Sequence, residues 1–577
     1  MIATHKAART RSILFASFLI CASLVPLRAQ YAPAQNPSAP NVAGSATQSQ
    51  NFASVSGTVV SASTGQPLRK ARVELSSIGD RNQNPPLGTT TDASGQFEID
   101  GITPGRYDLS ASRRGYVSKR YQQENADSPG AELTLSAGQT LKAITFRLEQ
   151  TAVIDGHVYD EDGDPLQGAA VQILRRAYMN GKRTMTTVNE VMTDDRGAYR
   201  MFGIEPGHYY VMASWGMGRM FADPGNRGEP TYAPVFYPNA DSAERAAPID
   251  LKPGDELPGM DFQLAPSNTR TYEVSGRATS ASGANGIFVT LTSKNPQAQF
   301  MTGFARREAT MDANGAFRFT GVAPGEYVIS ATTGLRRLGE ASGPPQSANR
   351  EISVVDSNVT GVSLVLSAGA SIVGHVAFEG DAGSANGTLM VNLSREDQTA
   401  LGNRGGPVGS DGTFTIAGVP DGQYTLNVYS RCGACFVKAV TSNGADLFGK
   451  PIDVEGGAGP SPLEIVYSSN TADVNGTVAT SDNQPGIGAL VVVIPNADAP
   501  DRERRYRTAT TDQYGRFDVK GVPPGEYTII ALQGMSDDQS FLDPDFMQQY
   551  ANKAETLNLT EGDHKTLQLN LVSVNTQ

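Results

Sequence analysis

The feature that most constrains this chain is a stretch of about 20 residues that occurs five times, at intervals of about 100 residues. The first copy starts at Thr91 and reads TDASGQFEIDGITPGRYDLSA. The later copies start at Thr193, Met311, Gly409 and Thr511. Internal repetition on this scale predicts that one structural unit is repeated along the chain.

Each copy predicts two strands joined by a turn, and apolar and polar residues alternate along each strand. In the first copy, Asp92 and Gly95 favour a tight turn, because Asp hydrogen-bonds its own backbone and Gly accepts a positive φ. Phe97 and Ile99 then alternate with polar residues, as in a half-buried strand. A Pro-Gly turn leads to the next alternating strand. In the fourth copy Asp421 replaces the Pro, which predicts a looser turn there.

The composition favours an all-β fold. The 577 residues include 61 Gly and 34 Pro, as in turn-rich β proteins. Each repeat opens with an apolar-x-Gly strand, such as Val55-Ser56-Gly57, and closes with two short alternating segments, which makes about seven strands. A short helix is expected only within 541–550. We therefore predict a tandem array of five antiparallel β-sandwiches, called repeats one to five. They are predicted to span 51–150, 151–267, 268–369, 370–470 and 471–577.

The N-terminal segment 1–29 predicts a secretory signal peptide. Basic residues precede the apolar run 13–25, and the small Ala29 follows it. The run is too short to span a bilayer comfortably; an uncleaved N-terminal anchor is the alternative. Residues 30–50 are uncharged and rich in Ala, Pro, Gln, Ser and Asn, which predicts a flexible linker. We expect an exported protein, periplasmic, cell-surface or secreted, with no membrane span after signal cleavage.

The net charge is −12 at pH 7. A nucleic-acid-binding chain would be expected to carry a basic face, so nucleic acid is not an expected partner.

The opening G-x-V strand, the D-x-x-G-x-F turn and the G-(I/V)-x-P-G-x-Y turn together resemble the carboxypeptidase regulatory-like domain. The resemblance extends over nearly all of 51–577. That family is grouped with transthyretin-like (prealbumin-like) and Cna-B-type sandwiches and with carbohydrate-binding-like folds. The resemblance implies Ig-like or prealbumin-like sandwiches. It implies little about function, since related domains are appended to peptidases, outer-membrane receptors and adhesins.

Two chemistries of the wider family lack their residues here. A metallocarboxypeptidase binds zinc through His-x-x-Glu, and no His of this chain has Glu three residues later; the five are His5, His157, His208, His375 and His564. Cna-B domains with an isopeptide bond carry an acid where this chain has Ala111, Ala213, Ala331, Tyr429 and Ala531. We therefore expect no zinc site, no isopeptide bond, no cofactor and no enzymatic activity.

The variable loop of repeat two is the strongest candidate for a ligand site. Sugars stack on exposed aromatic rings, which also anchor protein interfaces. The alternative is that the rings cover the end of their own sandwich as a small core. Repeat one offers a smaller aromatic set. The candidate sugar-binding residues are Trp215, Phe221, Tyr232, Phe236 and Tyr237 in repeat two, and Tyr116 and Tyr121 in repeat one.

Two further motifs have structural interpretations. Asp160, Asp162 and Asp164 lack the Glu that completes a calcium loop, so an acidic hairpin turn is the better interpretation. Cys432 and Cys435 lie in the variable loop of repeat four, and in an exported chain they predict a local disulfide.

The sequence leaves two functions open. The first is binding of a polysaccharide or glycan at the cell envelope through the aromatic loops. The alternative is a structural or adhesive stalk that binds envelope or extracellular proteins.

Overall fold

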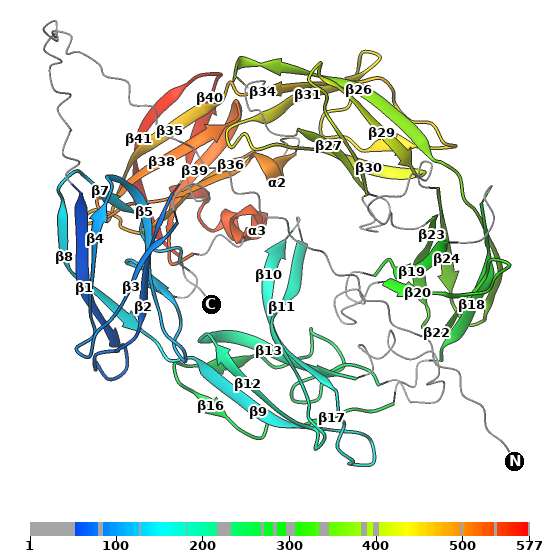
Figure 1. Cartoon of the computed structure of the whole chain (residues 1–577), viewed down its shortest axis with the longest axis horizontal. Coiled ribbons are helices and arrows are strands. Elements are labelled where there is room, and N and C mark those ends of the chain that lie inside the picture. Colours follow the sequence, from blue (N-terminus) through cyan, green and yellow to red (C-terminus); the bar gives the residue numbers. More distant parts are fainter. Residues whose placement is uncertain are drawn as a thin grey trace, which may run out of the picture. The chain divides into compact units, whose positions relative to one another are not determined.

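In the computed structural model, the β-strands lie between residues 53 and 573. The predicted signal peptide and linker lie outside the described residues. The structure describes residues 52–78, 85–125, 128–179, 182–215, 232–266, 270–280, 286–295, 306–333, 346–381, 389–395, 403–496, 499, 501–535 and 539–574. Within these ranges the chain is nearly all β, as predicted, and Figure 1 shows its strands in successive groups along the chain.

Repeat one forms two sheets around one core. Its strands are β1 (Ala53–Ser61), β2 (Arg72–Ser77), β3 (Leu87–Thr90), β4 (Gln96–Ile102), β5 (Gly105–Ser112), β6 (Lys119–Arg120), β7 (Leu133–Leu135) and β8 (Thr140–Leu148). One sheet has the order β4-β1-β8, and the other has β3-β2-β5-β6 with β7 also paired to β5. Alternate residues of β5, Tyr107, Leu109 and Ala111, are buried in the core, as the two-residue period predicts.

Repeat two has the same plan. Its strands are β9 (Ala152–Tyr159), β10 (Ala170–Met179), β11 (Lys182–Met192), β12 (Ala198–Ile204), β13 (Gly207–Ser214), β14 (Val235–Phe236), β15 (Ile249–Leu251), β16 (Glu256–Leu257) and β17 (Phe262–Gln263). One sheet has the order β12-β9-β16, with β17 also on β9. The other has β11-β10-β13-β14, with β15 also on β13.

Repeat three has two four-stranded sheets, β21-β22-β18-β25 and β20-β19-β23-β24. Its strands are β18 (Tyr272–Thr279), β19 (Ile287–Ser293), β20 (Arg306–Glu308), β21 (Thr310–Met311), β22 (Ala316–Val322), β23 (Gly325–Thr333), β24 (Ser347–Val354) and β25 (Val359–Val365).

Repeat four distributes its strands differently. They are β26 (Ala370–Glu379), β27 (Met390–Arg395), β28 (Arg404–Pro407), β29 (Thr413–Val419), β30 (Gly422–Tyr429), β31 (Phe436–Ser442), β32 (Ala445–Asp446), β33 (Ile452–Val454) and β34 (Leu463–Ser468). The sheets have the orders β29-β26-β34-β31-β32 and β28-β27-β30-β33. The strand after β30 therefore joins the sheet opposite to that of β30.

In repeat five one continuous path, β37-β36-β39-β41-β35-β38, joins both layers, and β40 pairs with β39. The strands are β35 (Ala472–Ala479), β36 (Leu490–Pro495), β37 (Arg507–Thr510), β38 (Arg516–Val522), β39 (Gly525–Gln533), β40 (Glu555–Leu559) and β41 (His564–Ser573). The helices are α2 (Arg502–Arg505) and α3 (Pro544–Gln548), with the 3-10 turns η4 (Ser540–Leu542) and η5 (Ala551–Lys553). The helix expected within 541–550 is α3.

Buried side chains form separate clusters in successive repeats. In repeat five a second cluster lies on the outer side of β36 and β39, where Phe541, Leu542 and Tyr550 cover Leu490 and Val492. Every residue of β36 is therefore buried. The division into five domains at the residues given above stays a prediction.

One detail differs from the antiparallel sandwich that we predicted. The first strand of each repeat pairs in parallel with a closing strand, for example β1 with β8, β18 with β25 and β35 with β41. The chain crosses to the other sheet and returns between these strands, so they can run in the same direction. The other pairs within each repeat are mostly antiparallel.

The parallel pair explains the glycine of the opening strand. A Cβ on Gly57 would lie 1.9 Å from the carbonyl oxygen of Ile144 in β8, and one on Gly476 would lie 1.9 Å from that of Leu567. No side chain fits at such a distance, so the backbones can approach only where the strand has a glycine. The corresponding distances for Gly156, Gly276 and Gly374 are 2.3, 2.0 and 2.3 Å.

The Asp that starts the repeated stretch organises a turn. Oδ1 of Asp92 accepts hydrogen bonds from the backbone N–H groups of Ser94 (2.9 Å) and Gln96 (2.8 Å). The N–H of Gln96 and the hydroxyl of Ser94 hold the pKa of Asp92 below its ordinary value, because they stabilise the carboxylate. Asp194, Asp312 and Asp512 accept equivalent pairs of bonds.

The Tyr of the Pro-Gly-x-Tyr stretch fixes the second turn. Its hydroxyl donates to the backbone carbonyl four residues earlier: Tyr107 to Thr103 (2.6 Å), Tyr424 to Pro420 (2.7 Å) and Tyr527 to Pro523 (2.6 Å). Tyr327 makes the same bond to Ala323. The Tyr ring folds back over the Gly, since a Cβ on Gly105 would lie 3.4 Å from the ring of Tyr107. The fourth copy keeps this bond although it lacks the Pro before its Gly.

Replacing Tyr424 by Phe should destabilise repeat four by about 1–2 kcal/mol, because the buried carbonyl of Pro420 loses its donor. The matched control is Tyr429→Phe on the same strand, whose side chain is 56% exposed; it should change stability by less than about 0.5 kcal/mol. Hydrogen exchange of the backbone amides of β29 and β30 in the full chain measures the change in stability for both variants. Equal effects of the two variants would show that the hydroxyl bond does not hold the turn.

Candidate functional site

The aromatic residues predicted in repeat two pack on their own sandwich. The Trp215 ring meets the Tyr232 ring edge-on, with 5.5 Å between ring centroids, and Nε1 of Trp215 donates to the carbonyl oxygen of Gln167 (2.9 Å). Tyr237 meets Phe262 edge-on at 6.0 Å, and Phe262 is a buried core residue. Trp215, Tyr232 and Tyr237 thus cover one end of the core of repeat two.

Phe236 is separate from this group. Its side chain is 1% exposed and packs with Leu174, Met212 and Ala240 in a second small cluster. β14, which carries Phe236, pairs with the end of β13. Phe221 lies outside the described residues.

Burial also changes the acidity of Tyr232. Loss of hydration, together with the nearby Glu161 carboxylate, raises the pKa of Tyr232 to about 12. The hydroxyl is protonated at physiological pH, as in an ordinary Tyr, and the raised pKa keeps it so at more alkaline pH.

The two candidates of repeat one are half-buried. Tyr116 and Tyr121 pack against the core of that repeat. The guanidinium of Arg113 lies over the ring of Tyr116, 5.3 Å from its centroid. Arg113 therefore occupies one face of this ring.

A sugar needs an exposed ring face for stacking. Among the candidates that the structure describes, Tyr232 and Phe236 are buried and the others are partly covered by protein. The placement agrees with the small-core alternative that the sequence left open. Binding of a glycan by these residues stays a prediction.

The acidic motif of repeat two forms a turn. Oδ1 of Asp160 accepts hydrogen bonds from the backbone N–H groups of Asp162 (3.0 Å) and Asp164 (2.8 Å), so this carboxylate stabilises the hairpin. Within the described residues, no group of three or more His, Cys, Asp or Glu side chains could hold a metal ion. None of the helices in these residues is long and apolar enough to cross a membrane.

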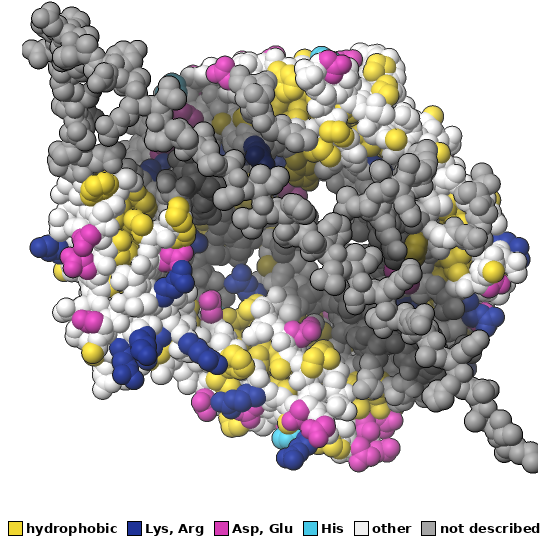
Figure 2. Space-filling view, viewed as in Figure 1, with side chains coloured by type: hydrophobic (Ala, Val, Ile, Leu, Met, Phe, Trp, Pro, Cys, Tyr) yellow, Lys and Arg dark blue, Asp and Glu magenta, His cyan; other side chains and the backbone are white. Residues whose placement is uncertain are grey.

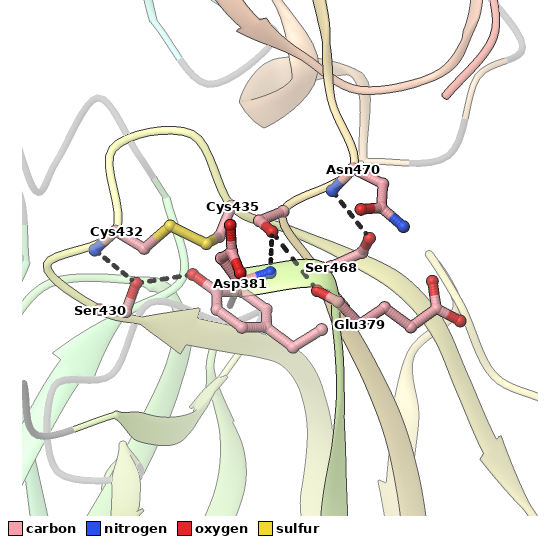
Figure 3. The surroundings of a disulfide bond; sticks show 9 residues. Glu379, Asp381, Ser430, Cys432, Cys435, Ser468 and Asn470 are labelled. Carbon is pink, nitrogen blue, oxygen red and sulfur yellow. Dashed lines mark hydrogen bonds between the residues drawn. A yellow bond between two sulfur atoms is a disulfide. The ribbon is translucent and has the colours of Figure 1, made fainter. Parts of the chain in front are cut away.

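Cys432 and Cys435 form a disulfide in the loop between β30 and β31, shown in Figure 3. The hydroxyl of Ser430 accepts from the N–H of Cys432 (3.0 Å) and pairs with the hydroxyl of Tyr467 on β34 (2.6 Å). The loop is thereby tied to the sheet that β31 joins.

Beside this loop lies a cavity of about 330 Å³ that the sequence did not predict. It is lined by the second half of β30, by β31, by 447–451 and by residues around α2. A sequence signal was available, since the segment after β30 in repeat four differs from those of the other repeats. Whether this segment leaves a cavity depends on which strand it pairs with, and the sequence of the segment does not reveal that pairing.

On the face shown in Figure 2, hydrophobic, acidic and basic side chains are interspersed. The histidines of the opening and closing strands sit near acids: Nδ1 of His157 lies 3.6 Å from Asp261, and Nδ1 of His375 lies 3.8 Å from Glu464. These side chains are roughly half exposed, and such surface contacts contribute little to stability.

A model of the carboxypeptidase regulatory-like domain matches residues 54–149 and 473–572. The resemblance seen in the sequence is confirmed for repeats one and five. The serine-aspartate repeat-containing protein F of Staphylococcus epidermidis is 24% identical over 274 residues, which cover 43% of this chain and 15% of that protein. The chain thus matches only a small part of this curated relative.

Solved structures with detectable likeness include the Bacillus anthracis TIE protein, at 16% identity and a TM-score of 0.16, covering 55% of this chain and 51% of that one. Another is GBS52, the minor pilin of Streptococcus agalactiae, at 12% identity and a TM-score of 0.21, covering 38% of this chain and 97% of that one. A third is BcpA, the major pilin subunit of Bacillus cereus, at 10% identity and a TM-score of 0.14, covering 72% and 99%.

Trp215→Ala should lower the local stability of repeat two by about 1–3 kcal/mol, because the ring covers the core and donates a hydrogen bond. The control is Phe202→Ala in the same repeat, whose side chain is 69% exposed; a change below about 0.5 kcal/mol is expected. Hydrogen exchange of the backbone amides of β9 and β13 measures the change in local stability for both variants. If Trp215→Ala leaves the exchange unchanged, the ring is not part of the core.

Labelling of the folded full chain with a thiol reagent, without reductant, should modify neither Cys432 nor Cys435, because their sulfurs are bonded to each other. After reduction both should react. Peptide mapping by mass spectrometry separates them from Cys21, the third cysteine. Ready labelling of both before reduction would contradict the disulfide.

Proposed function

We propose that this chain is an exported, non-enzymatic surface protein whose repeated sandwiches form a structural or adhesive stalk that binds other proteins. The matched domains of repeats one and five and the surface-protein relative support this proposal. The covered aromatic rings of repeat two give less support to a glycan-binding protein.

The observation that carries the proposal is how repeat one is joined to repeat two and repeat four to repeat five. Only Glu149, Gln150 and Thr151 separate β8 of repeat one from β9 of repeat two. The N–H of Val117 donates to the carbonyl of Glu149 (2.8 Å), and the N–H of Gly254 donates to that of Gln150 (3.1 Å). The connector is therefore hydrogen-bonded to the repeat on each side.

The connector between repeats four and five is equally short. Only Ser469, Asn470 and Thr471 separate β34 from β35. Nζ of Lys438 lies 2.7 Å from Glu379 of repeat four and 2.6 Å from Glu561 of repeat five. Hydrogen bonds to both carboxylates raise the pKa of Lys438. A flexible Gly/Ser linker would let neighbouring sandwiches move independently, whereas short, bonded connectors restrict them, as a stalk requires.

The proposal predicts saturable binding of the purified full chain to cell or matrix surfaces that carry its partner. Pretreating those surfaces with protease should abolish the binding, and oxidising their sugars with periodate should leave it intact. Fluorescent labelling of the chain and flow cytometry measure both. The repeat-two variants Trp215→Ala and Phe202→Ala should bind alike if the aromatic cluster is structural.

The reverse pattern would contradict the proposal. Binding that survives protease, is lost after periodate and is lost in Trp215→Ala would make this a glycan-binding protein with its site in repeat two. Circular dichroism of each variant excludes loss of binding through unfolding.

A further inference from the structure

In repeat four, one edge of a sheet is partly open. β30 pairs with β27 along nearly its whole length, from Tyr424 to Tyr429. On its other side, β33 pairs only with Gly422, Gln423 and Tyr424. Within the described residues, the second half of β30 therefore has no partner strand on that side.

The equivalent strands of the other repeats are paired at this place. The carbonyl of Leu109 accepts from the N–H of Tyr121 (2.8 Å), and that of Val211 accepts from the N–H of Tyr237 (2.8 Å). Ile329 pairs with Arg350 on β24, and Ile529 pairs with Glu555 on β40. These residues are all two positions after the Tyr of the repeated stretch, which makes Leu426 their counterpart in repeat four. Its carbonyl accepts instead from Nη1 of Arg504, at 3.3 Å.

The open edge has a cause in the following loop. After the Cys432–Cys435 turn the chain crosses to the opposite sheet, where Val437 of β31 pairs with Tyr467 of β34. The segment that could have paired with the second half of β30 therefore pairs with β34. The disulfide and the bond between Ser430 and Tyr467 hold the loop on this course (Figure 3).

The core beneath the open edge is incompletely covered. Leu426 and Val428 are only partly buried, whereas their counterparts in repeat one, Leu109 and Ala111, are 0% exposed. The cavity of about 330 Å³ lies here, with Leu426, Val428, Phe436 and others in its lining. An unpaired strand edge beside a cavity that has apolar side chains in its lining is the arrangement that accepts an added strand.

The charged residues around the cavity favour one kind of added strand over others. Its lining contains Lys450, Arg504, Arg505 and Arg507 but one acidic residue, Asp501, in a chain whose net charge is −12. Nε of Arg505 is buried without a hydrogen-bond partner among the described residues. An acidic segment would complement this lining.

We propose that the open edge of β30 binds an extended, acidic segment of a protein partner, which adds to the sheet as an antiparallel strand. Backbone hydrogen bonds to the second half of β30 hold the segment. Alternate apolar side chains enter the cavity next to Leu426 and Val428, and a carboxylate lies near Arg504 and Arg505. This inference rests on the proposed protein-binding function and names the kind of partner.

The probe is a synthetic peptide with the sequence of 554–561, AETLNLTE, which carries two acids and alternating leucines. In the chain this segment includes β40, the strand that covers the equivalent edge in repeat five. The full chain should bind the peptide saturably, and the amides of 426–429 should gain protection from hydrogen exchange. A peptide with Lys at both Glu positions should bind at least tenfold more weakly, and one with Pro in place of Asn should not bind, because Pro lacks the N–H that a ladder needs.

A chain variant tests the site itself. Arg504→Glu should weaken binding of AETLNLTE at least tenfold, because it replaces a cation beside the carboxylate. Arg431→Glu makes the same charge change on an exposed residue of repeat four outside the cavity lining, and it should leave binding within twofold. Equal affinity for the acidic and lysine peptides, or protection away from 426–429, would overturn the proposal.

Two other occupants would also overturn it. Light scattering that shows a dimer, with 426–429 already protected, would assign the edge to a second copy. Loss of that protection on deleting 1–50 would assign it to this chain's own N-terminal segment. If the chain binds protease-sensitive surfaces and Arg504→Glu does not affect this, the stalk function stands and the strand-addition site fails.

Discussion

The architecture depends on direct contact between two backbones in each repeat. The opening strand and a closing strand lie so close that a Cβ on Gly57 or Gly476 would lie 1.9 Å from a carbonyl oxygen of the facing strand. This contact joins the beginning of a sandwich to its end, and the antiparallel strands between them enclose the core. The Asp turn and the Tyr hydroxyl bond then fix the two strands that come before the variable loop of a repeat. The glycine of the opening strand and the Asp and Tyr of the repeated stretch are therefore geometric requirements of a sandwich.

These requirements explain why the fold could be predicted so far from the sequence. The turn at Asp92, the alternation of Phe97 and Ile99 and the strand after Gly105 are local features, which follow from side-chain chemistry within a few residues. The parallel pairing of β1 with β8 could not be predicted in the same way, because it depends on a crossing of the chain over nearly a whole repeat. The glycine of the opening strand signalled a close contact without identifying the strand that makes it.

The candidate site was harder to predict. The aromatic residues of the repeat-two loop have the composition of a binding loop, but whether a ring faces solvent or core depends on where the loop folds back. Trp215 and Tyr237 fold back onto their own sandwich. Conversely, Leu426 and Val428 have the pattern of an ordinary core strand, and only the course of the chain after Cys435 leaves them partly exposed. A cavity created by the loss of a neighbouring strand leaves no signature in the sequence of the strand that borders it.

The parallel contact between first and last strands has a mechanical consequence. Because β1 and β8 run in the same direction, the point where the chain enters repeat one and the point where it leaves lie at opposite ends of this strand pair. Tension applied through the neighbouring repeats would pull the two strands lengthwise past each other. Their hydrogen bonds would then be loaded together, whereas in a hairpin pulled from its open end they would break one after another. Each sandwich of this kind resists extension at the place where the chain passes through it.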